Sequence, residues 1–281
     1  MAAQDPNHRG IMVDDLSRGR RPLGSLGGVA EYATDAAGNV TGLVGPDGTV
    51  YGQALTIYQF GVPLIMAPSG SMGNNGAITL GTALDRTYEN CYLWLPANAI
   101  YAGSAAGLWY AVMSSTTVGT VYNNAYATGQ PAIPTTPTAF STTGPGAYTQ
   151  VTSAQTLFSC TIPGGSMGIN GDIEIEHFWK CNNDASTKDI LIQYGGSSFL
   201  GAGLASQVGA QLLDIIRNRG RADRQVAANK SSAYSAFGSS GSIYQSIDST
   251  VDQQLVVKAT LADATDYMVL TAARVTVRPF T

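Results

Sequence analysis

The most regular pattern in the chain is an alternation of apolar and polar positions near its end. Leu255, Val257, Ala259 and Leu261 alternate with other residues, which is the period of a strand with one buried face. Short apolar or aromatic runs recur elsewhere, bounded by Gly, Pro, Asn and Ser. The expected strands span residues 90–95, 107–113, 117–122, 188–194, 210–218, 253–261 and 267–277. We therefore expect an all-β fold of small β-sandwich or jelly-roll-like domains.

Residues 202–217 also carry a competing helical pattern. Leu204, Val208 and Leu212 are spaced by four residues, as they would be along one face of a helix. Glycine at positions 201, 203 and 209 weakens a helix, so a strand remains the favoured prediction.

An internal repeat divides the chain. Residues 68–80 read PSGSMGNNGAITL and residues 163–175 read PGGSMGINGDIEI, so that eight positions coincide. Each copy follows a short apolar stretch and opens an alternating strand. We expect two related β units, residues 53–126 and residues 155–281.

The segment between the two units, residues 127–154, is rich in Pro, Thr, Ser and Gly. Prolines at this density exclude a central strand and favour an extended conformation. We expect a semi-rigid linker.

Residues 1–52 show no helical or strand period and are expected to form an extended arm. Turn units recur at residues 35–40 and 45–50, where Gly stands beside Asp or Asn. An arm of this kind buries too little surface to order itself, so another subunit or protein is expected to hold it. The arginines that we expect to anchor it are Arg9, Arg18, Arg20 and Arg21.

Composition narrows the function classes. Hydrophobic residues make up 44% of the chain and charged residues only 12%, which suits a turn-rich β protein that assembles with copies of itself. A net charge of −4 gives no indication of a nucleic-acid partner. No apolar run approaches a membrane span, and the first residues do not resemble a secretory signal. The three cysteines have no paired spacing and are expected to be buried free thiols.

Two motifs could indicate catalysis or metal binding, and neither fits well. Residues 164–168 match G-x-S-x-G, but the segment leads into a strand, where a hydrolase would have a helix, so we expect a turn. Glu174 and Glu176 would share one face of that strand while His177 points to the other, which disfavours a metal site. No cofactor is expected, and an enzyme is disfavoured.

A cluster of arginines and several tyrosines are the remaining candidates. Arginines concentrate in residues 214–224 together with Asp214 and Asp223, and we favour an ion-paired interface loop over a nucleic-acid patch. The arginines of this loop are Arg217, Arg219, Arg221 and Arg224. Candidate glycan-contacting aromatics are Tyr101, Tyr122 and Tyr126, although tyrosines more often belong to cores and interfaces.

The Gly-Ser-Met-Gly-x-Asn-Gly repeat resembles an element of tailed-bacteriophage structural proteins. The run from Ser69 to Tyr122 resembles a module of phage appendage, tail-fibre and head-decoration proteins. The second unit, from Phe158 onward, resembles the module that often accompanies it, and residues 35–51 resemble N-terminal segments of fibre proteins. No catalytic residue follows from this resemblance.

The resemblance implies a non-enzymatic virion component, made in the host bacterial cytoplasm and then part of the particle. It would be a homotrimer or another symmetric oligomer that binds capsid, adaptor or tail proteins through its arm. A fibre or appendage would display its β units outward, where weak contacts to a host-surface glycan gain avidity from multiple copies. Two alternatives remain, a capsid decoration (cement) protein and a free carbohydrate-binding module. Neither a nucleic-acid partner nor membrane insertion is expected.

Overall fold

The computed structural model describes most of the chain from residue 55 onward and four short strands before it. These four strands form a separate antiparallel sheet in chain order: β1 (Pro22–Ser25), β2 (Gly28–Thr34), β3 (Val40–Val44) and β4 (Val50–Gly52). The described residues are 22–25, 28–34, 40–44, 50–52, 55–97, 105–126, 131–140, 146–230 and 237–279.

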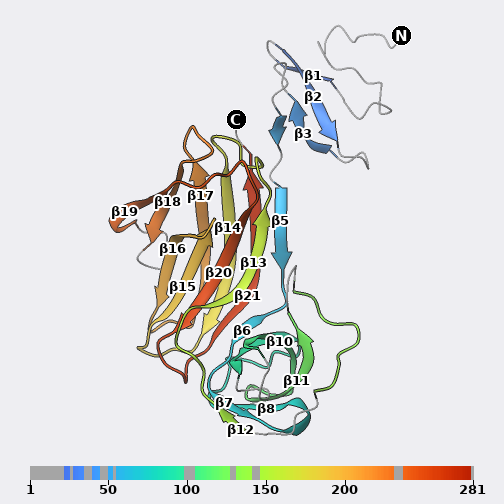
Figure 1. Cartoon of the computed structure of the whole chain (residues 1–281), viewed down its shortest axis with the longest axis vertical. Coiled ribbons are helices and arrows are strands. Elements are labelled where there is room, and N and C mark those ends of the chain that lie inside the picture. The colour runs from blue at the N-terminus through green and yellow to red at the C-terminus, as the bar shows by residue number, and fades with distance from the viewer. Residues whose placement is uncertain are drawn as a thin grey trace.

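A 13-stranded sheet runs through the described part of both predicted units (Figure 1). Its order is β12-β7-β8-β11-β10-β9-β6-β21-β14-β17-β18-β19, and β5 also pairs with β21. Neighbouring strands are antiparallel except for β6 and β9, which are parallel. The strands are β5 (Leu55–Phe60), β6 (Leu64–Met66), β7 (Gly70–Met72), β8 (Ala77–Leu80), β9 (Cys91–Leu95), β10 (Gly107–Met113), β11 (Val118–Ala125), β12 (Gly146–Tyr148), β14 (Asp172–Cys181), β17 (Gly209–Asn218), β18 (Gln225–Lys230), β19 (Phe237–Gln245) and β21 (Met268–Arg278).

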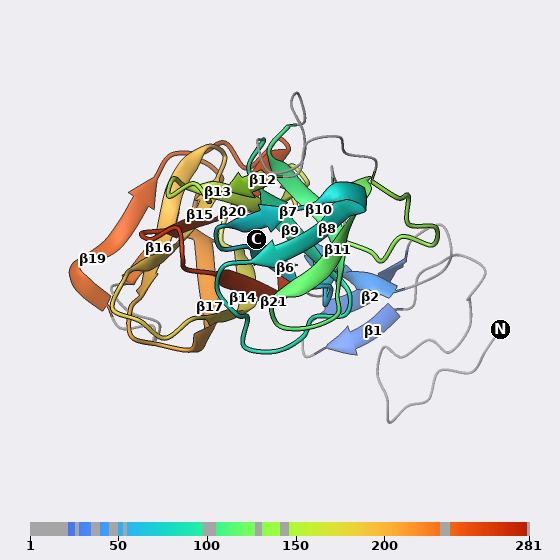
Figure 2. The same ribbon diagram turned by 90° about the horizontal axis from the view of Figure 1, so that it is seen from below.

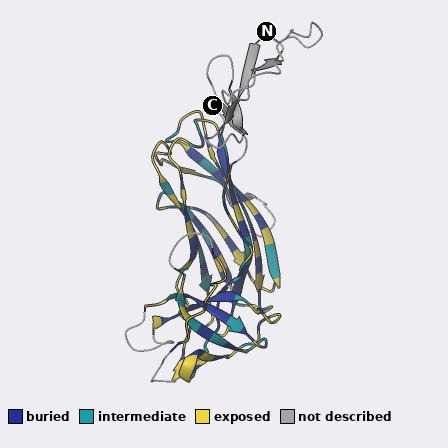
Figure 3. Cartoon of the chain, turned by 90° about the vertical axis from the view of Figure 1, so that its right-hand side faces the viewer, coloured by how far each residue is buried: buried dark blue, intermediate teal, exposed yellow. Residues whose placement is uncertain are grey.

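A four-stranded antiparallel sheet covers one face of the long sheet. Its order is β13-β20-β15-β16, with β13 (Gln155–Ile162), β15 (Lys188–Tyr194), β16 (Ser197–Leu204) and β20 (Gln253–Leu261). Buried side chains of β14, β17 and β21 pack against those of β13, β15 and β20 in one hydrophobic core. Figure 3 shows buried and exposed positions alternating along these strands. The expected all-β fold is confirmed, and the described residues from 155 to 279 form two layers around a core.

Alternation along each strand decides which side chains enter this core. In β14, Ile173, Ile175, His177 and Trp179 are buried, while Glu174 and Glu176 are only partly covered on the opposite face. The predicted strands at 188–194 and 253–261 match β15 and β20, and residues 202–217 form parts of β16 and β17 instead of a helix. The glycines of that stretch therefore decide against the helical pattern, as predicted.

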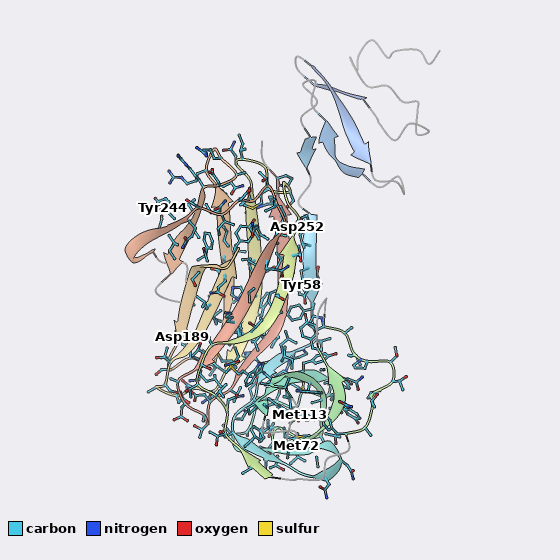
Figure 4. All side chains as sticks on the ribbon, viewed as in Figure 1. Tyr58, Met72, Met113, Asp189, Tyr244 and Asp252 are labelled. Atoms are coloured by element: carbon cyan, nitrogen blue, oxygen red, sulfur yellow. The ribbon has the colours of Figure 1, made fainter. Side chains whose placement is uncertain are left out.

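The first unit has its own core inside the curved part of the long sheet. Figure 2 shows strands β7 to β11 grouped together, apart from β16 and β19. Met72 and Met113 lie inside this group (Figure 4) and belong to a separate buried cluster. The two units are not separate in hydrogen bonding, because Leu64–Met66 of β6 pairs with Leu270–Met268 of β21.

Aromatic side chains fill the junction between the units. The ring of Tyr58 stacks on that of Phe158 at 5.2 Å between centroids, and its hydroxyl lies 2.7 Å from the hydroxyl of Tyr126. The ring of Tyr126 in turn meets Tyr92 edge to face at 5.6 Å. Core residues of both units thus form one continuous cluster.

The two copies of the repeat share buried positions and differ in backbone. Met72 and Met167 are both buried, as are Ile78 and Ile173 at the start of the following strand. In the first copy the short 3₁₀ turn η2 (Asn74–Gly76) links β7 to β8, and positive φ angles fall on Asn75 and Gly76. In the second copy they fall on Gly165 and Gly168 of a longer turn. The shared Met and Ile are therefore buried in both copies, although the turns between them differ.

Part of the predicted linker packs on the first unit. Strand β12 pairs with β7 at the edge of the sheet, which suits the expectation that this segment forms no central strand. Gln150 is buried, and its amide donates to the carbonyls of Ala67 and Trp94. The exact boundaries of the units stay predictions. No helix among the described residues has the length and apolar character needed to cross a membrane.

Candidate functional site

Strand register brings three features to one end of the long sheet. Asp172, the first residue of β14, lies opposite Arg217 of β17 and Arg278 of β21. Leu55, where β5 begins, lies opposite Val277 at the same end. The start of β5, the end of the last strand and the predicted arginine loop therefore lie at one end of the two-layered unit, which we call the arginine end.

Asp172 neutralises two arginines at this end. Its Oδ2 lies 2.8 Å from Nη2 of Arg217, and its Oδ1 lies 2.7 Å from Nε of Arg278. Nη1 of Arg278 also lies 2.9 Å from Oε2 of Glu174. Arg217 thus forms an ion pair that joins β17 to β14, with a partner outside the predicted loop.

The turn between β17 and β18 carries the other three predicted arginines. Arg221 donates from Nε and Nη2 to the two carboxylate oxygens of Asp223, at 2.8 and 2.7 Å. This side-chain hydrogen bonding, together with the positive charge of Arg221 and Arg224, holds the pKa of Asp223 below its usual range. The backbone N–H of Arg219 donates to the carbonyl of Arg224 at 2.9 Å and closes the turn.

Buried polar side chains hold this turn in place through hydrogen bonds. The amide nitrogen of Gln225 donates to Asn218 Oδ1 and to the carbonyls of Ala222 and Ile247, at 2.8 to 2.9 Å. The Ser249 hydroxyl donates to the same Ala222 carbonyl at 2.7 Å. Gln225, Asn218 and Ser249 are nearly inaccessible to solvent, so the turn is held by satisfied internal hydrogen bonds.

Arg219 and Arg224 line an open hollow beside the turn. The hollow has a volume of about 550 Å³, and its remaining lining residues are Gln225, Tyr244, Gln245 and Ser246. The guanidinium carbon of Arg219 lies 5.2 Å from the centre of the Tyr244 ring, within cation–π range. Tyr244 is 62% exposed and projects from β19 (Figure 4). Within the described part of the chain, no carboxylate forms an ion pair with either arginine.

The hollow can hold an anionic or planar polar group. Two guanidinium groups present donors suited to a carboxylate or phosphate, and an exposed tyrosine offers a face for stacking. Tyr244 and Gln245 were not among the predicted residues. The β18–β19 pairing brings them beside the turn, and no local sequence signal marks that pairing.

Asp214, expected to balance the arginine loop, instead lies in the core. Its position in β17 turns it inward, where its Oδ2 lies 2.7 Å from Nε2 of His177. His177 also accepts from the indole N–H of Trp179 at its Nδ1, at 2.6 Å. Asp223 is therefore the acidic partner within the loop, and Asp214 belongs to a buried histidine network.

The G-x-S-x-G segment forms a turn, as expected. The Ser166 hydroxyl donates to the carbonyl of Pro163 at 2.6 Å, and the segment leads into β14. Both ring nitrogens of His177 are engaged by Trp179 and Asp214. The arrangement differs from the strand–turn–helix of a nucleophile elbow.

The glutamates of β14 bind arginines across the sheet. Glu174 pairs with Arg278 and Glu176 with Arg274, on the face opposite His177, as the alternation predicts. Among the described residues, no group of three or more His, Cys, Asp or Glu could hold a metal ion.

The predicted tyrosines fall in two places. Tyr122 and Tyr126 are half-buried, with Tyr122 against Tyr110 and Tyr126 in the aromatic junction. Tyr101 lies outside the described residues, as do Arg9, Arg18, Arg20 and Arg21. A glycan contact for these tyrosines and an anchoring role for these arginines stay predictions.

All three cysteines are buried free thiols, as predicted. Burial raises the pKa of Cys91 far above its usual range and that of Cys160 to about 12. The thiols therefore behave as small apolar side chains in the core.

Comparison of the chain with known proteins finds no matching family model, no matching curated protein and no matching solved structure. The functional conclusion therefore depends on the site, the fold and the resemblance carried by the repeat.

Proposed function

We propose that the protein is a non-enzymatic structural component of a tailed-phage virion, attached through residues 1–52 and displaying its β units outward as a fibre or appendage. The sequence support is the Gly-Ser-Met-Gly-x-Asn-Gly repeat and the arm that precedes it. The structural support is the strand register that places the junction with the arm and the arginine turn at one end of the sheet. In this proposal the arginine end faces the particle.

The two-unit organisation fits a display role. Strand β6 pairs with β21, and the aromatic junction joins the cores of both units. Shared hydrogen bonds and a shared core resist hinge motion between the units, so a force on one unit is transmitted to the other. We propose that the units are related jelly-roll-like or sandwich-like domains, with Met72 and Met167 in corresponding core positions.

The proposed partner at the arginine end is an acidic surface of a capsid, adaptor or tail protein. Arg219 and Arg224 lie at an open hollow and would meet carboxylates of that partner, while Arg217 and Arg221 are already paired with Asp172 and Asp223. Protein interfaces are enriched in arginine and tyrosine, and Tyr244 lies beside these two arginines. In the assembled particle the protein is proposed to be a homotrimer or another symmetric oligomer.

A pull-down of virion proteins with the full chain and with a chain lacking residues 1–52 tests the proposal. Retention of an adaptor or tail protein by the full chain alone supports an arm-anchored fibre. Retention of the major capsid protein identifies a head fibre or decoration protein. If neither chain retains a virion protein, the virion proposal fails and a free carbohydrate-binding module becomes the better explanation.

A further inference from the structure

A lysine without solvent exposure lies between two carboxyl groups at the end of the two-layered unit opposite the arginine turn. Lys188 begins β15, next to Asp189, which Figure 4 labels at this end. Its Nζ lies 2.5 Å from Oδ1 of Asp184 and 3.6 Å from Oδ2 of Asp266. Lys188 and Asp266 are both 0% exposed, whereas the side chain of Asp184 is 38% exposed. An amine and a carboxyl group are thus held close together away from water.

Neighbouring polar groups orient the Asp266 carboxyl. The amide nitrogen of Asn182 donates to its Oδ1 at 2.7 Å, and the amide oxygen of Asn182 accepts from the backbone N–H of Tyr267 at 2.9 Å. A fixed donor at Oδ1 stabilises negative charge that develops there when a nucleophile attacks the carboxyl carbon.

The pKa values of the two carboxyl groups are shifted in opposite directions. Burial first, and hydrogen bonding to Asp184 second, raise the pKa of Asp266. Burial acts in the same direction on Asp184, but hydrogen bonds from Asp266, Lys188 and Ser186 and the charge of Lys188 outweigh it and lower its pKa. Ser186 Oγ lies 2.5 Å from Oδ1 of Asp184 and from Oδ2 of Asp266. A hydroxyl has one proton to donate, which suits one carboxylate and one carboxylic acid at this position.

We propose that Lys188 and Asp266 join in an intramolecular isopeptide bond, with Asp184 as the base. Asp184 takes one proton from the Lys188 ammonium, and the freed lone pair of Nζ forms a bond to Cγ of Asp266. The C–Oδ2 bond breaks, and Oδ2 leaves as water with its own proton and a second proton from Nζ. The products are a secondary amide, one water molecule and a protonated Asp184, which faces solvent and releases its proton. No oxidant, reductant or co-reactant is needed.

Two physical features favour this reaction. Keeping a charged ammonium away from water is costly, and the reaction replaces the Lys188 ammonium with a neutral amide. The reacting groups are held together by the fold, so the reaction is intramolecular and gains from proximity.

The bond would join the start of β15 to the loop between β20 and β21, where the two units meet. Lys188 follows the loop after β14, and Asp266 lies in the loop between β20 and β21. The second loop also contacts the first unit, because the carbonyl of Ala264 accepts from the backbone N–H of Ser69 at 2.7 Å. A covalent bond here would secure the junction between the units, independently of where the protein attaches.

The intact mass of the purified full chain under denaturing conditions tests the proposal. We expect a mass lower than that of the sequence by one water molecule, and a tryptic map in which a branched peptide joins Lys188 to Asp266. An unmodified mass with normal cleavage after Lys188 overturns the proposal. A water loss that maps elsewhere, for example to a cyclised Asp47–Gly48, overturns it equally.

Three variants complete the test. Asp266→Ala removes the carboxyl group and must show the full mass of its own sequence. Asp184→Asn keeps the shape of the base but not its basicity, so the unmodified mass should persist in protein that is folded by circular dichroism. Asp189→Asn, which changes the exposed neighbour of Lys188, must still lose one water. Loss of water from Asp266→Ala, or its absence from Asp189→Asn alongside a modified parent chain, would contradict the assigned bond.

Discussion

The imidazole of His177 and the carboxylate of Asp214 form a hydrogen bond inside the core, with Nε2 and Oδ2 2.7 Å apart. Because Nδ1 accepts from the Trp179 indole, the ring proton lies on Nε2 and is donated to Asp214. His177 has no solvent exposure, and both of its nitrogens are satisfied. Its surroundings therefore give it a structural part in the two-layered unit.

Replacing His177 with Phe tests that role. The ring volume is kept, but the buried indole N–H of Trp179 loses its acceptor and Asp214 loses a donor. We expect the free energy of unfolding to fall by about 1–3 kcal/mol for each group left without this partner, measured by urea denaturation. Lys180→Gln, at an exposed position of the same strand, is the control and should change stability little. An unfolding midpoint of His177→Phe equal to that of the parent chain would refute the structural role.

Gly76 provides a test of the first repeat turn. Its φ is +78°, and a Cβ built on it would lie 2.1 Å from the carbonyl oxygen of Val121. We expect Gly76→Ala to destabilise the chain by about 1–3 kcal/mol, because both the backbone angle and the close contact oppose a side chain. In Gly107→Ala the new Cβ would meet nothing within 4 Å, and this control should stay close to the parent in thermal denaturation. Equal loss in both variants would contradict the turn geometry.

Burial of the thiols predicts an alkaline loss of stability. The pKa of Cys160 is about 12 in the folded chain and about 8.5 in an unfolded one, so the folded state holds this proton more tightly. Its contribution to stability is therefore complete below about pH 8.5 and is lost progressively as the pH rises toward 12. The urea concentration at the unfolding midpoint should therefore decrease as the pH is raised from about 7.5 to about 9.5, a range below the pKa of tyrosines in the unfolded chain.

Thiol labelling checks the same prediction directly. At mildly alkaline pH the native chain should react slowly with a thiol reagent, and the denatured chain should label at all three cysteines. Rapid labelling of Cys91 or Cys160 in the native chain would show that the core is open there.

The arginine hollow predicts a charge-dependent interaction. Replacing Arg219 and Arg224 together with Ala should weaken retention of a virion partner at least several-fold, and added salt should weaken the parent in the same way. Arg221→Ala is the matched control, because Arg221 is paired with Asp223 at the surface. Its loss should leave retention and the urea midpoint near those of the parent. If Arg221→Ala weakens retention as much as the double variant, the hollow is not the contact site.

Local structure was predictable where the pattern of side chains within one strand is enough to identify that strand. The alternation at 253–261 matches β20, because side-chain period alone distinguishes a half-buried strand. The aromatic run at 107–113 matches β10, a strand buried on both faces, because aromatic residues favour strands. The turn at residues 164–168 was predictable for the same reason, since an alternating strand follows it. Pairing between distant strands was not predictable. The contact of β6 with β21 joins residues about two hundred positions apart and depends on register, which no local pattern specifies.

The candidate site was predictable only in part. The arginine loop was identified from its composition, but Asp214 was assigned to it because sequence neighbourhood does not reveal that a strand turns this residue inward. Tyr244 reaches the hollow through the β18–β19 pairing, and Asp266 reaches Lys188 through two separate loops. Both contacts depend on tertiary structure, which the local sequence does not specify.

Co-sedimentation with particles tests the proposed function most directly. Cells that carry the gene are induced to lyse, the particles are purified on a density gradient, and the chain is followed by immunoblot through the gradient and a high-salt wash. The account predicts that the chain peaks with intact particles, in a fixed ratio to the major capsid protein. A chain found only in the soluble fractions, while the particles are intact and complete, would contradict it.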